Sequence, residues 1–300
     1  MLRYNISMNL CNDYSNMVLN WMKYLGKSSK KTGWDIVYEY FNLNKKVLLP
    51  HKRNVFFSKE FVCPDEVQTG LELLINKFRN GEDVTSHLSK AALNPSKPDE
   101  LLYDWGIYHF HLGQERDAKS NFIQRSGPIL FARVDDENVY CINVYPHGVN
   151  VLPPWCRQEM IKIVHNNWPE TVNQYRIEGV SLLYPQGEPP TDREYAMLRK
   201  SHVTTMLEVE KNIVYAPLGG GMALSGHSME ITRQCNHIWN TLKQNELYIQ
   251  KNVSFFIKKI KDEIGDFPIG EKRYFKLWCK NERFCVVDLA SLVAFHEIRF

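Results

Sequence analysis

Apolar positions along the chain follow helical spacing in some segments and strand spacing in others. Residues 14–26 carry apolar side chains three and four positions apart and stop at a glycine, as an amphipathic helix does. Residues 54–62 are rich in β-branched and aromatic side chains, and residues 107–112 alternate between two faces, which predicts strands. Two further strands, at residues 127–134 and 138–148, are joined by an Asp-Asp-Glu turn that predicts a hairpin. The expected fold class is α+β.

Helices are expected on both sides of these strands. Pro64, followed by two acidic residues, has the composition of a first helical turn, and Gly81 ends the apolar pattern that follows. A second helix is predicted over residues 155–168 and is terminated by Pro169. The central region therefore predicts an antiparallel sheet with flanking helices.

The order of these patterns divides the chain into three parts. Residues 1–53 are predicted to form an N-terminal helical extension, and residues 54–175 the central sheet domain. A stretch rich in glycine and proline follows, which is typical of a linker. Residues 190–300 then contain two predicted hairpins around a long helix that begins after Ser228, which indicates a second, C-terminal α+β domain.

The composition is that of a globular protein in a reducing compartment. The chain has 300 residues, enough for about two domains, and seven scattered cysteines without a Cys-x-x-Cys pair, so neither a zinc ribbon nor a disulfide framework is predicted. No leader peptide is recognised, and the longest apolar run is interrupted by Asp288. A cytoplasmic location without a membrane partner is expected. The net charge of +3 permits contact with RNA or DNA but does not demand it.

Histidines concentrate on the predicted central sheet. His109 and His111 lie two positions apart on one strand, so they share a face. On the strand at 138–148, strict alternation places Tyr145 and His147 on the face of Cys141. Surface strands usually carry threonine, lysine and glutamate at such positions. We therefore expect a sheet with one apolar face and one polar face, on which the imidazoles converge.

Imidazoles at this spacing suit two kinds of chemistry. A histidine can accept and donate a proton near neutral pH, as attack of a ribose 2′-hydroxyl on an RNA phosphate requires. Neutral histidines in a His-x-His pair with a third histidine can also ligate a metal ion. Arg125, just before the middle strand, could bind a phosphate. The nearest acid is Asp104, and the sequence leaves both chemistries open.

A glycine-rich loop at residues 218–226 precedes the long C-terminal helix, the position in which phosphate-binding loops occur. It lacks the Gly-Lys-Ser/Thr ending of a P-loop and the spacing of a dinucleotide motif. A structural role is favoured, and no cofactor is expected.

The order of elements between residues 54 and 168 resembles that of the RelE/ParE toxin superfamily, with HFHLG, Arg125, GPILFARVDDENVYCINV and Tyr145-Pro-His147 carrying the resemblance. It implies a RelE-like domain of bacterial type that cleaves mRNA, commonly on the ribosome, without a metal, and that an antitoxin restrains. Arg125 would match the phosphate-binding arginine. Tyr145 and His147 would match the terminal active-site residues, and His109 and His111 would occupy a strand that often carries catalytic basic residues.

The leading hypothesis is a toxin-like endoribonuclease that uses general acid/base catalysis, as the toxic arm of a toxin–antitoxin or phage-defence module. Its site would comprise His109, His111, Arg125, Tyr145 and His147. Two alternatives remain: a non-catalytic module that binds protein or nucleic acid, and a metal-dependent hydrolase built on the His-x-His pair.

Overall fold

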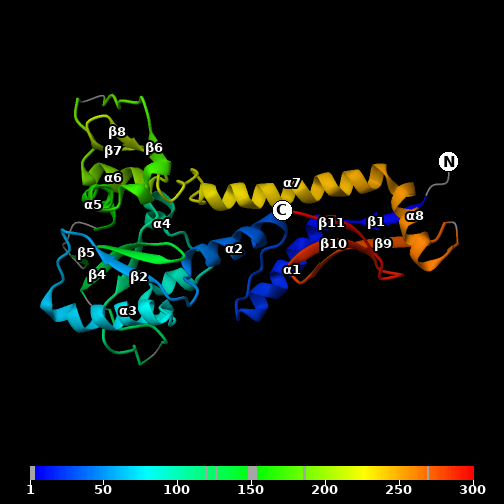
Figure 1. Cartoon of the computed structure of the whole chain (residues 1–300), viewed down its shortest axis with the longest axis horizontal. Helices are drawn as coiled ribbons and strands as arrows, with labels where there is room; N and C mark the ends of the chain where they lie inside the picture. Colours follow the sequence, from blue (N-terminus) through cyan, green and yellow to red (C-terminus); the bar gives the residue numbers. More distant parts are fainter. Residues whose placement is uncertain (1–3, 119, 126, 148–153, 185–186, 269) are drawn as a thin grey trace. The chain divides into compact units, whose positions relative to one another are not determined.

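The computed structural model describes residues 4–118, 120–125, 127–147, 154–184, 187–268 and 270–300 (Figure 1). Residue 148 of the expected strand and residues 185–186 of the expected linker lie outside this set. The fold is mixed α+β, as expected. No described helix is both long and apolar enough to cross a bilayer.

The chain forms two compact units, and their boundaries differ from the expected three-part division. Unit 1 combines the two ends of the chain, Met1–Phe41 and Ile231–Phe300, and unit 2 is the continuous segment Asn42–Glu230. The first predicted helices therefore cluster with the C-terminal strands. Residues 190–230, expected in the C-terminal domain, belong to the unit that holds the central sheet.

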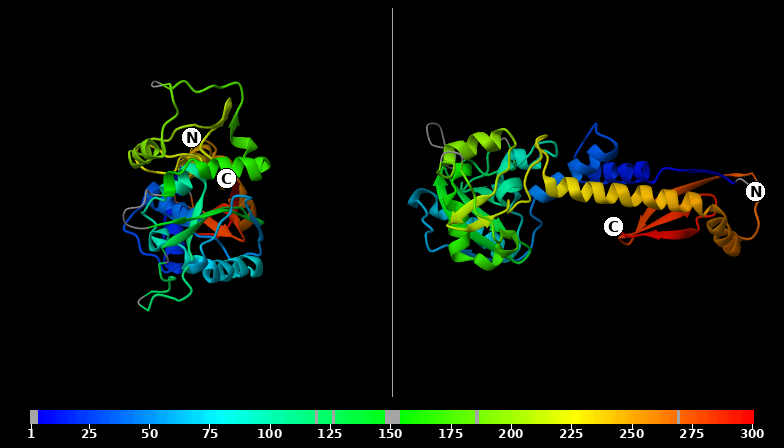
Figure 2. Two further views of the ribbon diagram at one scale, coloured as in Figure 1. Left: turned by 90° about the vertical axis from the view of Figure 1, so that its left-hand side faces the viewer. Right: turned by 90° about the horizontal axis from the view of Figure 1, so that it is seen from above.

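Unit 1 is built on a four-stranded sheet in the order β1-β9-β10-β11. Figure 2 shows its C-terminal strands in orange and red. Its strands are β1 (Asn5–Met8), β9 (Lys272–Lys280), β10 (Arg283–Asp288) and β11 (Ala294–Ile298). Its helices are α1 (Leu10–Tyr24), most of α2 (Gly33–Lys46), most of α7 (Met229–Lys251) and α8 (Val253–Ile264). The β9–β10 hairpin confirms the predicted closing hairpin, whereas the parallel pairing of β1 with β9 was not predicted.

Two helices pack on the same face of this sheet. Tyr14 of α1 contacts Phe284 of β10, with ring centroids 5.8 Å apart. Phe256 of α8 contacts Phe295 of β11 at 5.3 Å, and Phe275 of β9 reaches the same ring at 4.6 Å. These aromatic contacts form the core of unit 1 on the inner face of the sheet.

Unit 2 holds the predicted central sheet, with strand order β2-β5-β4-β3. Its strands are β2 (Asn54–Phe57), β3 (Tyr108–His111), β4 (Pro128–Val134) and β5 (Asn138–Pro146). The β4–β5 hairpin confirms the prediction from the Asp-Asp-Glu turn. The expectation of an antiparallel sheet is wrong at one edge, because β2 runs parallel to β5 and makes the sheet mixed.

Both faces of the central sheet are buried, so the expectation of one polar face is wrong. Its helices are α3 (Gln68–Asn80), α4 (Glu100–Trp105) and α5 (Glu159–Asn167). Leu71, Leu74 and Phe78 of α3 pack on one face, while α4 and α5 belong to the core cluster of the other (Figure 1). Helices α3 and α4 precede the β4–β5 hairpin in the chain and α5 follows it. Together these helices cover both faces of the sheet.

A β-bulge changes which residues of β5 share a face. Phe131 lies opposite Asn143 but the adjacent Ala132 lies opposite Cys141, so Ile142 is an extra residue on β5. Val144 therefore joins the core cluster of Cys141, and Tyr145 that of Ile142. The expected strict alternation, which placed Tyr145 with Cys141, is wrong for this reason.

A smaller three-stranded sheet completes unit 2. It has the order β6-β8-β7 and comprises β6 (Arg176–Ile177), β7 (Leu207–Glu210) and β8 (Ile213–Tyr215). Helix α6 (Asp192–Lys200) begins with a capping box between Thr191 and Glu194. Short 3₁₀ turns connect these elements: η1 (Asp65–Val67), η2 (Thr85–His87), η3 (Lys90–Leu93), η4 (Pro154–Cys156), η5 (Pro169–Thr171) and η6 (Asn173–Tyr175).

The glycine-rich loop packs against the end of α4. The amide of Gly219 donates to the Asp104 carbonyl at 2.9 Å, and that of Gly221 donates to the Tyr103 carbonyl at 2.8 Å. A Cβ atom on Gly219 would lie 2.1 Å from the Leu102 carbonyl oxygen. The amides that a phosphate would need are bonded to α4, and this supports the structural role favoured from the sequence.

Candidate functional site

Two histidines of β3 project onto the same face of the central sheet. His109 pairs with Phe131 and His111 with Ile129 across the β3–β4 ladder. Directly paired residues share a face, and Ile129 pairs in turn with Tyr145 on β5. The structure therefore brings His109, His111 and Tyr145 to one face, and the bulge is what places the tyrosine there.

Trp155 connects two of the predicted histidines. Its ring centroid lies 5.7 Å from that of His109 and 4.7 Å from that of His147. The backbone amide of His147 donates to the Gly127 carbonyl at 2.8 Å, which holds the start of the segment after β5 beside β4. His109 and His147 thus both contact one indole ring.

The imidazoles of β3 have unused hydrogen-bonding capacity. Nδ1 of His109 and Nδ1 of His111 are buried, and neither has a hydrogen-bond partner among the residues that the structure describes. A buried polar atom without a partner costs about 1–3 kcal/mol, so such atoms are uncommon outside sites that serve a ligand.

Burial and neighbouring positive charge lower the pKa values of His111 and His147 and keep these two rings neutral. Burial, with the nearby His109, Arg125 and His147 adding positive potential, lowers the pKa of His111 to about 4. Burial followed by Arg125 and His109 also lowers the pKa of His147. At neutral pH both rings are bases with a free lone pair, the form that accepts a proton.

Arg125 is exposed and lies beside this cluster. It lines a cavity of about 270 Å³ together with His111, and Lys90 and Asp117 of the same cavity form an ion pair of 2.9 Å. Among the described residues Arg125 forms no ion pair, so its guanidinium is available to an anion. The predicted association of Arg125 with the histidines is present in the fold.

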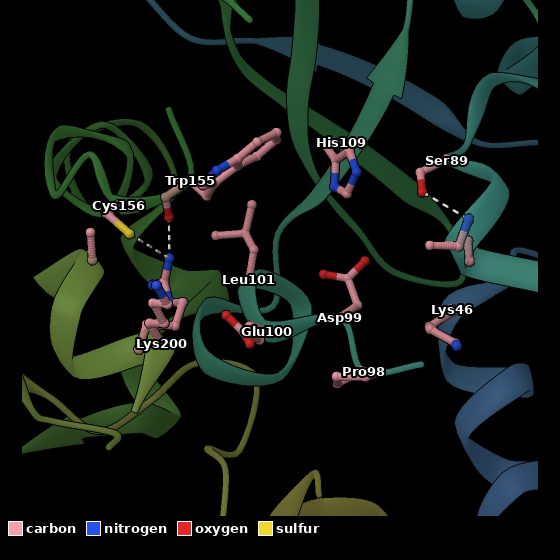
Figure 3. Close-up of a pocket in the computed structure, with 14 residues that line it drawn as sticks. Lys46, Ser89, Pro98, Asp99, Glu100, Leu101, His109, Trp155, Cys156 and Lys200 are labelled. Carbon is pink, nitrogen blue, oxygen red and sulfur yellow. Dashed lines mark hydrogen bonds between the residues drawn. The ribbon is translucent and has the colours of Figure 1, made fainter. Parts of the chain in front are cut away.

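His109 lines a second, larger cavity (Figure 3). This cavity has a volume of about 470 Å³, and His109 and Trp155 lie above Leu101 and Asp99 in the view. Its walls are mainly apolar, with alanines from η3 and α6 and with Pro98. The two histidines of β3 therefore open into different cavities, a larger one with mainly apolar walls and a smaller one that Arg125 lines.

Tyr145 is placed less favourably for contact with a substrate. The residue is buried, its hydroxyl donates to Glu159 at 3.3 Å, and the Arg157 guanidinium lies 4.7 Å from its ring centroid. Burial and the carboxylate of Glu159 raise the pKa of its phenol to about 12. The ring supports the floor of the site as part of the core.

His87 belongs to the cluster but was not predicted. Its Nδ1 lies 2.9 Å from the His111 carbonyl oxygen, so Nδ1–H donates and Nε2 carries the lone pair. That Nε2 atom is buried without a hydrogen-bond partner among the described residues, and burial lowers the pKa of the ring. A single histidine in a short polar segment gave no sequence signal.

Asp104, the acid nearest the histidines in sequence, serves another partner. It is buried and receives hydrogen bonds from Nε and Nη2 of Arg199 at 3.0 and 2.8 Å. The same guanidinium donates to the Trp155 carbonyl and lies 4.2 Å from the Trp105 ring centroid. Arg199, which the sequence did not single out, thereby fixes the wall of the larger cavity beside His109.

Within the described residues, no three His, Cys, Asp or Glu side chains are grouped so that they could hold a metal ion. Comparisons of the chain with protein-family models, with curated proteins and with solved structures found no match. The candidate site is therefore argued from its own geometry.

Proposed function

We propose that this chain is a toxin-like endoribonuclease of the RelE/ParE kind that cleaves RNA by general acid/base catalysis without a metal. The observation that carries the proposal is the group of imidazoles with unpaired nitrogens beside the guanidinium of Arg125, which forms no ion pair within the described part of the chain. Its partners would be RNA, which toxins of this kind commonly cleave on the ribosome, and an antitoxin.

Cleavage of RNA requires a base for the 2′-hydroxyl, an acid for the leaving 5′-oxygen and a cation for the phosphorane. His109 and His147, which both contact Trp155, would act as base and acid. An RNA phosphate would raise the pKa of His147, because a nearby negative charge favours the imidazolium. Arg125 would neutralise the phosphate, and His111 and Tyr145 would position the other groups.

The first test uses growth and RNA integrity after induced expression of the wild type, of His109→Ala/His111→Ala and of His147→Ala. The exposed His237 on α7 provides a matched control variant, His237→Ala. Growth arrest with RNA cleavage in the wild type and the control, lost in the site variants, is expected. Purified protein should cut single-stranded RNA in the presence of EDTA, and cleavage abolished by EDTA would instead favour the metal-dependent hydrolase.

The larger cavity favours one alternative, a non-catalytic module that binds a ligand or partner. Its mainly apolar walls suit a binding pocket, and His109 would then contribute a hydrogen bond only. Arrest that persists with intact RNA in the histidine variants would support this alternative over catalysis.

A further inference from the structure

Strand β9 of unit 1 presents a row of cationic and aromatic side chains on its outer face. The strand alternates strictly, and Arg273, Phe275 and Leu277 point into the core of the unit. The opposite face carries Lys272, Tyr274, Lys276, Trp278 and Lys280.

The two aromatic rings of this row are unusually open to solvent. Tyr274 is 42% exposed and Trp278 is 46% exposed. Both belong to β9, an inner strand of a sheet whose other face is buried. The helices α1 and α8 pack on the inner face, through Phe284 and Phe295, and leave the rings uncovered. Exposed aromatic rings on a strand serve as stacking surfaces in proteins that bind single-stranded nucleic acid.

The cations of the row are largely free of acidic partners. Lys276 pairs with Asp13 at 2.8 Å, whereas Lys272 and Lys280 form no ion pair among the residues that the structure describes. The Nζ atom of Lys272 lies 5.0 Å from the Tyr274 ring centroid. The row therefore combines positive charge with flat rings, the combination that a phosphate backbone with unpaired bases requires.

The neighbouring strand extends this surface. Arg283 pairs with Lys280, and Cys285 pairs with Trp278, so both lie on the same outer face of β10. A hollow of about 670 Å³ is lined by Lys280, Arg283 and Cys285 among others. The acid at its edge, Glu297, is paired with Arg299 at 3.3 Å.

We propose that the outer face of β9 and β10 binds single-stranded RNA, with Tyr274 and Trp278 stacking on bases and with Lys272, Lys280 and Arg283 contacting phosphates. The two rings are four residues apart, or roughly 13 Å along the strand, so each serves a different base. A duplex hides the faces of its bases inside the stack, and therefore does not offer them to these rings. This binding does not depend on the histidine site of unit 2.

The test is fluorescence anisotropy of the full chain with a fluorescein-labelled 2′-O-methyl uridine dodecamer, which lacks the 2′-hydroxyl and cannot be cleaved. Trp278→Ala and Tyr274→Ala should each weaken binding about tenfold, the loss expected for one stacked base. Trp278→Phe should retain most of the affinity, because phenylalanine also stacks. Tyr24→Ala, which removes a ring that is 92% exposed at the end of α1 and belongs to neither β9 nor β10, should leave binding unchanged.

Heparin, a polyanion without bases, separates stacking from charge. It should compete weakly with the dodecamer, and its own binding should be insensitive to Trp278→Ala. The absence of binding by the wild type, or equal affinity of the wild type and Trp278→Ala for the dodecamer, would overturn the proposal. Because His109→Ala/His111→Ala should bind the dodecamer normally, failure of the catalytic proposal and failure of this one give different results.

Discussion

Acidification should lower the free energy of unfolding of this protein through His111. The size of the loss follows from the lowered pKa of this ring in the folded chain. The pKa of the ring is about 4 in the folded chain, against the ordinary 6.5 of an exposed histidine, because it is buried and faces further positive groups. Below pH 6.5 the imidazole of His111 is protonated in the unfolded chain. In the folded chain it stays neutral until the pH falls to about 4. The stability associated with the neutral ring is therefore complete above pH 6.5 and is lost as the pH falls toward 4.

The size of the effect follows from the difference between the two pKa values. At 1.36 kcal/mol per pH unit, the interval between 6.5 and about 4 corresponds to about 3 kcal/mol of unfolding free energy. His111→Gln removes the titrating group and keeps a polar side chain, so its loss of stability between pH 7 and pH 4 should be smaller than that of the wild type by this amount. His87 titrates in both proteins and cancels from the comparison.

Urea unfolding, followed by far-UV circular dichroism at pH 7, 6, 5 and 4, measures this difference. The exposed His237 supplies the control, because His237→Gln should follow the wild type at every pH. If His111→Gln and the wild type lose equal stability between pH 7 and pH 4, the ring is not held neutral by the fold and the reasoning fails. The statement that the His111 ring is neutral at neutral pH would fail with it.

Two further predictions concern the packing around α4, and thermal denaturation followed by circular dichroism checks both. Arg199→Met leaves the Asp104 carboxylate buried without its partner and should cost about 3–5 kcal/mol, whereas adding Asp104→Asn should restore part of the loss. An unchanged melting temperature in Arg199→Met would contradict this. Gly219→Ala forces a methyl group against the Leu102 carbonyl and should cost about 1–3 kcal/mol or more, while Gly127→Ala, which meets nothing within 4 Å, should be neutral. Equal melting temperatures of the two alanine variants would refute the close approach.

Local patterns in the sequence predict the elements of unit 2 well. Helix α3 ends at Gly81, which adopts a left-handed φ of 75°, as a C-terminal glycine should. The hairpin between β4 and β5 lies at the predicted turn. These features depend on neighbours in the sequence, and so periodicity and turn chemistry are sufficient to find them.

Features that depend on distant partners were not predictable in this way. The bulge at Ile142 arises from how β5 meets β4, and it moved Tyr145 to the face of the histidines. The pairing of β1 with β9 joins segments from opposite ends of the chain. His87 reaches the cluster only because α3 and the following turns fold back onto β3. Periodicity and turn patterns in a single sequence do not predict contacts between residues that are far apart in the chain.

The candidate site was predicted in its composition and mispredicted in its setting. His109, His111, His147 and Arg125 do gather near one end of the sheet, as the His-x-His spacing suggested. The sheet was expected to have one polar face that carries them, yet helices cover both faces. Alternation of polar and apolar residues on a strand cannot reveal whether a helix from elsewhere in the chain will cover the polar side.

The discontinuous construction of unit 1 has a consequence for the time order of folding during synthesis. A ribosome completes Asn42–Glu230 before it makes the strands that Met1–Phe41 must join. Unit 2 can therefore fold while β1 is still without β9, and Tyr14 of α1 lacks its partner Phe284 until β10 has been made. Premature termination between Glu230 and Lys272 would therefore leave unit 2 whole and β1 without its partner strand.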